Sequence, residues 1–365
     1  MRWYLNPTVR RDSTFRGLFS EDEYRELRAC TSARNDASPT PLRSLQTIAR
    51  ALGIAAVHAK DETHREGVSA FKITGVSYAV ERLGAEATIR GLVCATAGNH
   101  GRAVARVANR KGVPCTVFLP VARTADPIEA RIRLDRVEAM RQDGATLVDV
   151  EGSYEEAVRR ATRFGAESGA TIVSDTSWDG YAQIPRWIMA GYTQLFEEAS
   201  HQWDARPEIV IVQGGVGGLV CAAVSWFAAR YGADRPLLVA AEPEPAACLL
   251  GSAEAGGPTR VTGDLNTIMA GLRCAEPSPL AWPTIAAGVD VFVTVTDAEV
   301  VEVMTSLTSG KDERIDAGPS GACGLAALRA MVCAPAFAAL RSRIRLGPST
   351  HALVVITEGL QPVMR

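Results

Sequence analysis

One stretch decides how the chain folds: Lys60-Asp61-Glu62-Thr63-His64-Arg65-Glu66-Gly67-Val68-Ser69-Ala70-Phe71-Lys72. It follows a short apolar run, residues 55–60, and its last residue opens a second apolar run with helical spacing, residues 73–83. Lys72 is therefore expected at the buried end of a helix, beside the ring of Phe71. Burial removes hydration from an ammonium group, so we expect a lowered pKa and an amine able to form a Schiff base. The alternative is an ordinary helix lysine whose amine reaches solvent.

Outward from this stretch, short apolar runs alternate with helical periods across short links, and the alternation restarts at residue 208. This pattern is typical of open, mostly parallel α/β sheets, and it predicts two α/β domains with a ligand-binding cleft between them. Residues 1–40 are polar and predict an arm that contains one helix. Strands are predicted at residues 55–60, 91–95, 113–119, 145–150, 171–174, 209–212, 237–242, 291–295 and 352–357. Helices are predicted at residues 21–30, 45–52, 73–83, 102–111, 129–143, 154–168, 219–231, 297–309 and 320–331.

The composition is that of a globular protein: 365 residues, of which 47% are hydrophobic and 22% charged. The net charge is only −2 and no basic cluster interleaves with aromatic residues, so we expect no nucleic-acid partner. No apolar run reaches membrane-spanning length and residues 1–7 lack a signal-peptide core, so we expect no membrane association. Eight cysteines occur singly and five histidines are scattered, which predicts reduced thiols, a cytoplasmic location and no metal site.

A glycine-rich turn, Gln213-Gly214-Gly215-Val216-Gly217-Gly218, lies between a predicted strand and a predicted helix. Glycines let a backbone approach an anion closely, and the helix N-terminus adds a favourable dipole. The turn therefore predicts a cradle for a monophosphate. The rival interpretation is a dinucleotide fingerprint with Glu242, at the end of the next strand, as its acidic residue. That fingerprint requires a glycine at position 220, where the chain has Val220.

The third segment of interest is the turn Ala95-Thr96-Ala97-Gly98-Asn99-His100-Gly101, called the third turn below. It also lies between a predicted strand and a predicted helix. Its backbone N–H groups and the Thr96 hydroxyl are suited to bind a substrate carboxylate, and Asn99 offers an amide donor. The alternative is that the asparagine and histidine only cap the turn.

These three segments, in this order, resemble the tryptophan-synthase-β type (fold type II) of pyridoxal-phosphate enzymes. Within that group the chain is most similar to the 2,3-diaminopropionate ammonia-lyases. The likeness extends over about residues 55–360, and its specific stretches are Lys60-Asp61-Glu62, Asp175-Thr176-Ser177-Trp178-Asp179-Gly180-Tyr181, Ile184-Pro185-Arg186-Trp187-Ile188-Met189-Ala190-Gly191-Tyr192, Thr267-Ile268-Met269-Ala270-Gly271-Leu272 and Ile356-Thr357-Glu358-Gly359. We accordingly expect a large cofactor-binding domain of residues 1–80 and 190–365, and a small domain of residues 81–189.

The resemblance implies how pyridoxal 5'-phosphate would be held. Lys72 would bind it as a Schiff base and later remove the α-proton of the substrate. Phe71 would pack beside the cofactor and Asn99 would hydrogen-bond its ring hydroxyl. Thr357 would face the pyridine nitrogen, where a neutral hydroxyl suits elimination better than transamination. The phosphate would lie in a cradle formed by Gly214, Gly215, Val216, Gly217 and Gly218.

The resemblance also implies how an amino-acid substrate would be bound. Its carboxylate would lie at the third turn, on Thr96, Ala97, Gly98 and His100. Asp175 would lie near the leaving group, where a carboxylate can hold and protonate a departing amine. The alternative for Asp175 is a helix N-cap for the segment around Trp178.

Two departures from the ammonia-lyase pattern bear on the substrate. Ala97 replaces an aspartate that is expected to act as the base for the D-isomer, so we predict no turnover of D-2,3-diaminopropionate. Gly318-Pro319-Ser320-Gly321-Ala322 stands where the ammonia-lyases tend to carry Gly-Glu-Ser-Gly. Both departures resemble serine and threonine dehydratases, although the dehydratases have glutamate at the position of Gly318.

The sequence therefore predicts α,β-elimination on a small L-amino acid, with L-2,3-diaminopropionate converted to pyruvate and ammonia as the best single reaction. The alternatives are a serine- or threonine-type dehydratase, or a specialised biosynthetic enzyme that eliminates or replaces another β-substituent. From a different class, a non-catalytic cofactor-binding protein would retain Lys72, Asn99 and the glycine turn without turnover. The family resemblance also implies a homodimer.

Overall fold

The computed structural model describes residues 1–34, 38–96, 98–121, 127–309 and 312–360, with the side chains of 127–133 and 136 excepted. The strands are β1 (Trp3–Leu5), β2 (Leu42–Ser44), β3 (Ala56–Asp61), β4 (Leu92–Ala95), β5 (Cys115–Val121), β6 (Thr146–Glu151), β7 (Thr171–Ile172), β8 (Ile209–Gln213), β9 (Leu237–Pro243), β10 (Val291–Val295) and β11 (His351–Ile356). The helices are α1 (Glu21–Ser32), α2 (Gln46–Leu52), α3 (Lys72–Glu86), α4 (Asn99–Lys111), α5 (Pro127–Gln142), α6 (Tyr154–Ser168), α7 (Gln183–Tyr192), α8 (Gln194–Ser200), α9 (Gly218–Tyr231), α10 (Cys248–Ala255), α11 (Trp282–Gly288), α12 (Asp297–Ser309), α13 (Pro319–Cys333) and α14 (Ala338–Ile344).

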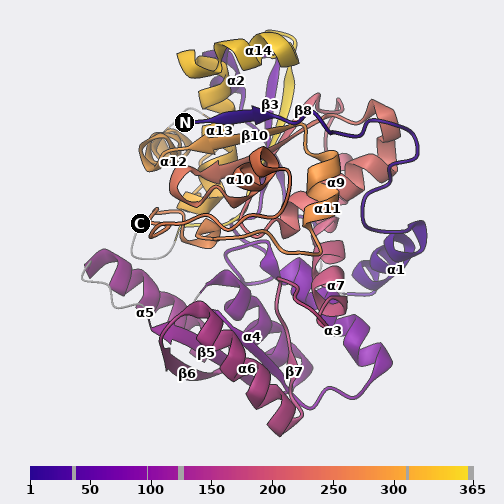
Figure 1. Cartoon of the computed structure of the whole chain (residues 1–365), viewed down its shortest axis with the longest axis vertical. Coiled ribbons are helices and arrows are strands. Elements are labelled where there is room, and N and C mark those ends of the chain that lie inside the picture. Colours follow the sequence, from indigo (N-terminus) through magenta and orange to yellow (C-terminus); the bar gives the residue numbers. More distant parts are fainter. Residues whose placement is uncertain (35–37, 97, 122–126, 310–311, 361–365) are drawn as a thin grey trace.

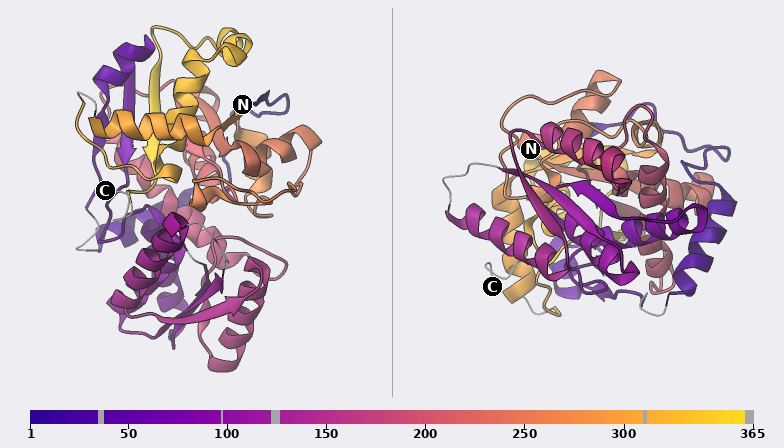
Figure 2. Two further views of the ribbon diagram at one scale, coloured as in Figure 1. Left: turned by 90° about the vertical axis from the view of Figure 1, so that its left-hand side faces the viewer. Right: turned by 90° about the horizontal axis from the view of Figure 1, so that it is seen from below.

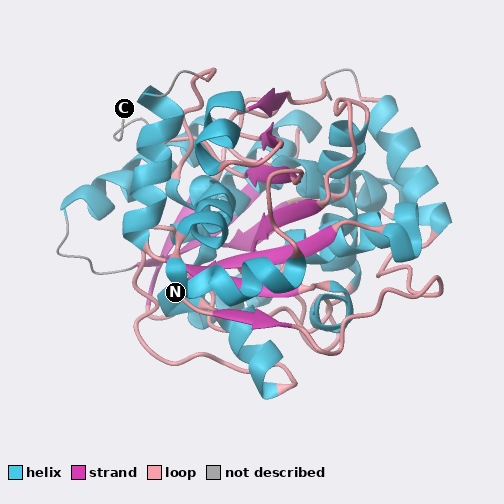
Figure 3. Ribbon diagram, turned by 90° about the horizontal axis from the view of Figure 1, so that it is seen from above, coloured by secondary structure: helices cyan, strands magenta, loops and turns pink. Residues whose placement is uncertain are grey.

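Two separate sheets organise these elements (Figure 1). The larger has the order β1-β10-β9-β8-β11-β3-β2, with the five central strands parallel and both edge strands antiparallel. The smaller has the order β6-β5-β4-β7 and is parallel throughout. Helices flank the strands on both sides when the molecule is viewed from above (Figure 3). The α/β class that the sequence predicts is confirmed.

The central strands are apolar because both of their faces are covered. Ile209–Gln213 and Val291–Val295 are buried along their whole length, as parallel strands between two helical layers must be. Helix α9 is apolar on nearly every side and is buried from Gly218 to Ala228. No single helix in the described ranges is long and apolar enough to cross a bilayer, although α13 and α14, bent by 79°, pass that test as a pair by length and composition.

The small sheet lies at the opposite end of the molecule from α14 (Figures 1 and 2). The predicted domain boundaries, between residues 80 and 81 and between 189 and 190, fall inside α3 and α7. These two helices pack closely at glycines: a Cβ on Gly75 would lie 2.5 Å from the Ile188 carbonyl oxygen, and one on Gly191 would lie 2.7 Å from the Gly75 Cα. The division into two domains stays a prediction.

Several short elements escaped the sequence analysis. The predicted N-terminal arm contains a strand, because Trp3–Leu5 pairs antiparallel with Val291–Val293 of β10. A strand of three residues is too short to show a readable alternation of apolar and polar positions. Helices α7, α8, α10, α11 and α14 have between seven and ten residues each, which gives too few turns for a helical period to stand out.

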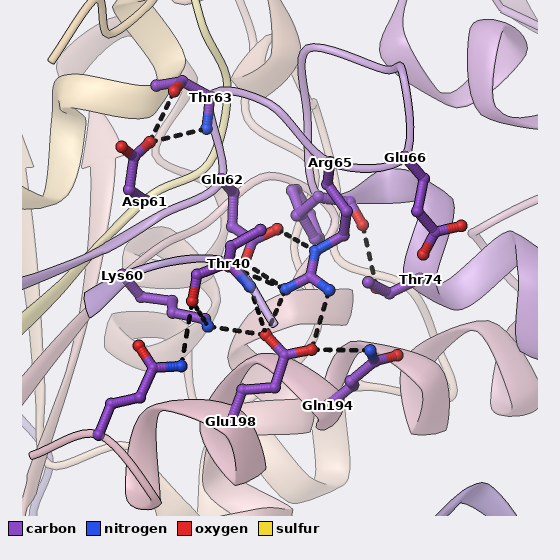
Figure 4. Close-up of polar contacts among 12 residues, drawn as sticks. Thr40, Lys60, Asp61, Glu62, Thr63, Arg65, Glu66, Thr74, Gln194 and Glu198 are labelled. Carbon is purple, nitrogen blue, oxygen red and sulfur yellow. Dashed lines mark hydrogen bonds and ion pairs between the residues drawn. The ribbon is translucent and has the colours of Figure 1, made fainter. Parts of the chain in front are cut away.

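A cluster of four buried charges lies beneath the turn that leads to Lys72 (Figure 4). Arg65 donates to both Glu62 oxygens, at 2.6 and 2.7 Å, and to both Glu198 oxygens, at 2.9 and 2.6 Å. Lys60 donates to Glu198 Oε2 at 2.7 Å and to the Thr40 carbonyl oxygen at 2.6 Å. Two cations and two anions balance, so each buried charge has a partner and the cluster ties β3 to α8.

We predict that Glu198→Ala lowers the free energy of unfolding by about 3–5 kcal/mol, because it leaves Lys60 and Arg65 with a single buried carboxylate between them. Glu302→Ala is the matched control, since the Glu302 side chain is 59% exposed in its pair with Arg329. The control is expected to cost less than about 1 kcal/mol. Urea denaturation of both variants measures the difference, and equal losses would contradict the prediction.

Candidate active site

The predicted site residues follow the carboxyl ends of strands in both sheets. Lys72 lies after β3, the glycine turn after β8 and Thr357 after β11, all in the large sheet. Asn99 and Asp175 follow β4 and β7 of the small sheet. Ligands bind parallel α/β sheets at this edge, so the topology places both sets of side chains where one ligand can reach them.

A tight turn sets the position of Lys72. Arg65 and Val68 exchange two backbone hydrogen bonds of 2.8 Å around Glu66 and Gly67, whose φ angles are +53° and +80°. The Gly359 N–H then donates to the Ser69 carbonyl at 3.0 Å, and the Phe71 N–H donates to the Thr357 carbonyl at 3.2 Å. The segment is thereby fixed to the end of β11, and Lys72 opens α3.

Lys72 and Asp175 form an ion pair between the two sheets, with 2.6 Å between Nζ and Oδ2. Burial lowers the pKa of Lys72, but Asp175 and Tyr192 raise it by more, so the net pKa lies above its usual value. The lowered pKa that the sequence analysis predicts is therefore wrong for the free amine, because burial is not its only influence. Burial likewise raises the pKa of Asp175, but the Lys72 ammonium group lowers it by more, so the net pKa lies below its usual value and the carboxylate stays ionised.

Asp175 does not cap a helix. The segment after it forms a turn in which Trp178 and Tyr181 exchange backbone hydrogen bonds of 3.2 and 2.9 Å, and their rings stack at 4.1 Å. The next helix, α7, begins only at Gln183. The helix N-cap alternative for Asp175 is therefore wrong, and its carboxylate points to Lys72 instead.

Aromatic side chains surround the amine of Lys72. Its Nζ lies 5.2 Å from the centroid of the Phe71 ring and 5.5 Å from that of Tyr192, and these two rings are 4.7 Å apart. Both ring faces attract a cation and exclude water from it. Phe71 lies where the sequence places it, whereas Tyr192, at the end of α7, has no sequence signal that links it to Lys72.

Asn99 and Glu358 make another contact between the two sheets. The Asn99 Nδ2 donates to Glu358 Oε2 at 2.6 Å, and Glu358 Oε1 accepts from the Ser320 N–H at 3.1 Å. The sequence analysis did not assign Glu358 to the site, although a carboxylate directly after Thr357 at a strand end is a usable signal. Thr357 is buried, and its hydroxyl lies 3.4 Å from the Ser320 carbonyl oxygen.

Three carbonyl groups of the glycine turn are already hydrogen-bonded within the protein. The carbonyl oxygens of Gly215, Val216 and Gly217 accept hydrogen bonds from the Cys248 thiol and from the backbone N–H groups of Ser278 and Cys221. Helix α9 begins at Gly218, so the first N–H groups of that helix have no acceptor within its own ladder. This arrangement leaves N–H donors and a helix dipole for an anion.

Glu242 is not available to a ribose. Its carboxylate is buried and accepts the backbone N–H groups of Leu249 and Leu250 at 2.7 and 2.8 Å. Burial raises its pKa to about 8, against the effect of these two N–H donors. Glu242 therefore caps α10 from inside the protein, and the dinucleotide interpretation loses its acidic residue.

The third turn is only partly as predicted. The Gly98 N–H donates to the Thr96 hydroxyl oxygen at 3.1 Å, so it is engaged within the turn. Ala97 lies outside the described residues. Helix α4 begins at Asn99, so its first N–H groups have no acceptor within the helix, which suits a carboxylate. His100 is buried, and its Nε2 lies 2.9 Å from the Val173 carbonyl oxygen.

Gly318 has a packing reason to lack a side chain. A Cβ there would lie 2.8 Å from the Gly359 carbonyl oxygen and 3.0 Å from Glu358 Cγ. Glu358 thus fills the space that a glutamate at position 318 would need.

In the described part of the chain, no group of three or more His, Cys, Asp or Glu side chains is placed to hold a metal ion.

Comparison with known proteins identifies the family. Residues 34–357 match the model of the family described as "Pyridoxal-phosphate dependent enzyme". The chain belongs to this family.

Its relatives include diaminopropionate ammonia-lyases. The protein of that name from Salmonella typhimurium is 34% identical over 88% of this chain and 85% of its own length. The one from Escherichia coli K12 is 31% identical over 94% of this chain and 89% of its own. A crystal structure of the Escherichia coli protein, in complex with an aminoacrylate–PLP azomethine reaction intermediate, has a TM-score of 0.88 at 29% identity and covers all of this chain and 94% of that one. The chain is a fold type II, pyridoxal-phosphate-dependent enzyme.

The residues of the site fit this cofactor. A partly buried amine beside two aromatic rings, a turn of N–H donors at a helix N-terminus, and a neutral hydroxyl at the end of β11 meet at one edge of the large sheet. Pyridoxal phosphate requires groups of these three kinds: an amine that can form an imine, N–H donors for the phosphate and a partner for an unprotonated ring nitrogen.

We predict that Gly217→Ala lowers the free energy of unfolding by about 1–3 kcal/mol, since Gly217 has a φ of +94°. A Cβ there would also lie 2.4 Å from Ile285 Cδ1. Gly218→Ala is the matched control, because the nearest atom to its Cβ would be 3.6 Å away and the residue is helical. Urea denaturation of both proteins without cofactor tests this, and a Gly218 variant as unstable as the Gly217 variant would contradict it.

Proposed function

We propose that this chain is an ammonia-lyase that converts L-2,3-diaminopropionate and water to pyruvate and two molecules of ammonia. The observation that carries the proposal is the partly buried Lys72–Asp175 pair: an amine able to bind the cofactor lies 2.6 Å from a carboxylate that itself binds an ammonium group. The likeness to the two diaminopropionate ammonia-lyases over most of the chain supports the same substrate.

In this proposal the cofactor is held from both sheets. Lys72 binds it covalently, and the glycine turn of residues 214–218 binds its phosphate. Asn99 contacts its ring hydroxyl, Thr357 its ring nitrogen, and Phe71 packs beside it. When bound, pyridoxal phosphate supplies an electron sink that stabilises negative charge at the substrate Cα.

The protein side chains then handle the protons and the leaving group. The substrate carboxylate lies at the third turn, on Thr96, Ala97 and Gly98, close to the N-terminus of α4. Lys72 removes the proton from Cα. Asp175 binds the β-ammonium group and keeps it oriented as the Cβ–N bond breaks. Water then completes the hydrolysis that yields pyruvate and the second ammonia.

Asp175 distinguishes diaminopropionate from the hydroxy-amino acids that are the alternative substrates. A partly buried, ionised carboxylate favours a cationic β-substituent, whereas the hydroxyl group of serine or threonine is neutral. The ion pair therefore supports diaminopropionate over a hydroxy-amino acid, despite the dehydratase-like Ala97 and Gly318-Pro319 positions.

The same proposal includes the setting of the enzyme. We place it in the cytoplasm as a homodimer, as the family resemblance implies, with a large domain of residues 1–80 and 190–365 and a small domain of residues 81–189. Size-exclusion chromatography with light scattering measures the number of chains directly.

We predict that Lys72→Ala abolishes the visible absorption band of the lysine-bound cofactor and lowers the rate of pyruvate formation by roughly 1,000-fold or more. Lys111→Ala is the matched control, because Lys111 ends α4 and pairs with Glu81 at 2.8 Å, away from the site. The control should keep both signals. A band without pyruvate formation in the wild type would instead favour a non-catalytic cofactor-binding protein.

Stereochemistry provides a separate prediction. Ala97 cannot accept a proton, so the kcat/KM for the D-isomer of 2,3-diaminopropionate should be at least about 100-fold below that for the L-isomer. Coupled assay of pyruvate from the two isomers measures the ratio, and Ala97→Asp is expected to raise the D-isomer rate. Comparable turnover of both isomers by the wild type would show that another base serves the D-isomer.

A further inference from the structure

The hydrogen bonds of His100 fix which of its nitrogens can accept. Its Nε2 lies 2.9 Å from the Val173 carbonyl oxygen, which can only accept, so Nε2 carries the proton and donates. Burial lowers the pKa of His100 more than the nearby Asp175 raises it. The ring is therefore neutral and Nδ1 is an unprotonated acceptor.

This acceptor faces a second acceptor. His100 is 6% exposed, and its Nδ1 is buried without a hydrogen-bond partner in the described part of the chain. Asp175 Oδ2 lies 3.9 Å from Nδ1, and the same oxygen receives the Lys72 ammonium group at 2.6 Å. Two acceptors that face each other repel unless a donor joins them, and leaving a buried acceptor unpaired is costly. The arrangement thus calls for a hydrogen-bond donor that lies between His100 Nδ1 and Asp175 Oδ2.

We propose that His100 Nδ1 and Asp175 Oδ2 form a two-acceptor seat for the β-ammonium group of the substrate, and that this seat selects an amine over a hydroxyl group at Cβ. The inference rests on the proposed function and assigns His100 to the leaving group rather than to the substrate carboxylate.

The geometry suits an ammonium group. One nitrogen can reach both acceptors across 3.9 Å with two hydrogen bonds of about 2.8 Å. An ammonium group has three N–H donors and can serve both acceptors at once, whereas a hydroxyl group has one hydrogen and would leave one acceptor unpaired. A site with buried acceptors rejects a ligand that cannot pair them all, so the seat discriminates by donor count as well as by charge.

His100→Gln tests the seat. The glutamine amide can keep the hydrogen bond to the Val173 carbonyl but places no acceptor where Nδ1 lies. We compare kcat/KM for L-2,3-diaminopropionate with kcat/KM for β-chloro-L-alanine, whose chloride leaves without an ammonium group. The ratio of the two should fall by roughly 10- to 100-fold in the variant, as expected for one lost hydrogen bond to a charged group. A merely structural role for His100 would lower both values together and leave the ratio unchanged, which would overturn the seat.

A second measurement needs no variant. Assigned nitrogen-15 spectra of the wild-type imidazoles should show His100 as the neutral Nε2–H form, and its Nδ1 signal should shift when L-2,3-diaminopropionate is added. A proton on Nδ1 would overturn the seat. Failure of the wild type to use diaminopropionate, while it still eliminates chloride, would overturn the proposed function itself. Turnover of diaminopropionate with an unchanged ratio in the variant would overturn the seat alone.

Discussion

The ion pair between Lys72 and Asp175 connects the large sheet to the small sheet at the candidate active site. One partner opens a helix that follows the large sheet, and the other follows a strand of the small sheet. Each charge is partly buried, and each keeps the other ionised against the effect of burial. Any movement of one sheet relative to the other would expose or separate these charges, so the pair couples the arrangement of the sheets to the state of the lysine.

Further charged contacts fix the segment that leads to Lys72. The buried cluster of Lys60, Glu62, Arg65 and Glu198 fixes the end of β3, and Arg65 belongs to the turn that leads to Ser69 and Lys72. On the far side of the same turn, the Glu66 carboxylate contacts Arg34 and Arg110. Arg110 belongs to α4, the helix that follows strand β4 of the small sheet. The turn is therefore tied to both sheets by charge. This explains how Lys72, the first residue of α3, is held in a defined position beside Asp175.

Much of this could be predicted from sequence, and the limits have physical causes. Strands β3, β4, β8 and β11 are mostly buried, so their ends were readable, and with them the placement of Lys72, Asn99, the glycine turn and Thr357. Asp175 follows β7, which has only two half-buried residues, and it was placed by the family resemblance. The direction of the pKa shift of Lys72 could not be predicted from sequence, because it depends on a carboxylate 103 residues further along the chain. Tyr192 and the free Nδ1 of His100 were missed for the same reason: contacts between elements leave no spacing in the sequence. Short elements such as Trp3–Leu5 have too few residues to show a period.

The central claim is that this site eliminates an ammonium group from Cβ. Counting products tests it most directly, by measuring ammonia and pyruvate from L-2,3-diaminopropionate with the wild-type enzyme loaded with pyridoxal phosphate. Two molecules of ammonia are expected for each pyruvate, in a constant ratio throughout the reaction. Ammonia released without pyruvate, or no release of either product while L-serine is converted to pyruvate, would contradict it.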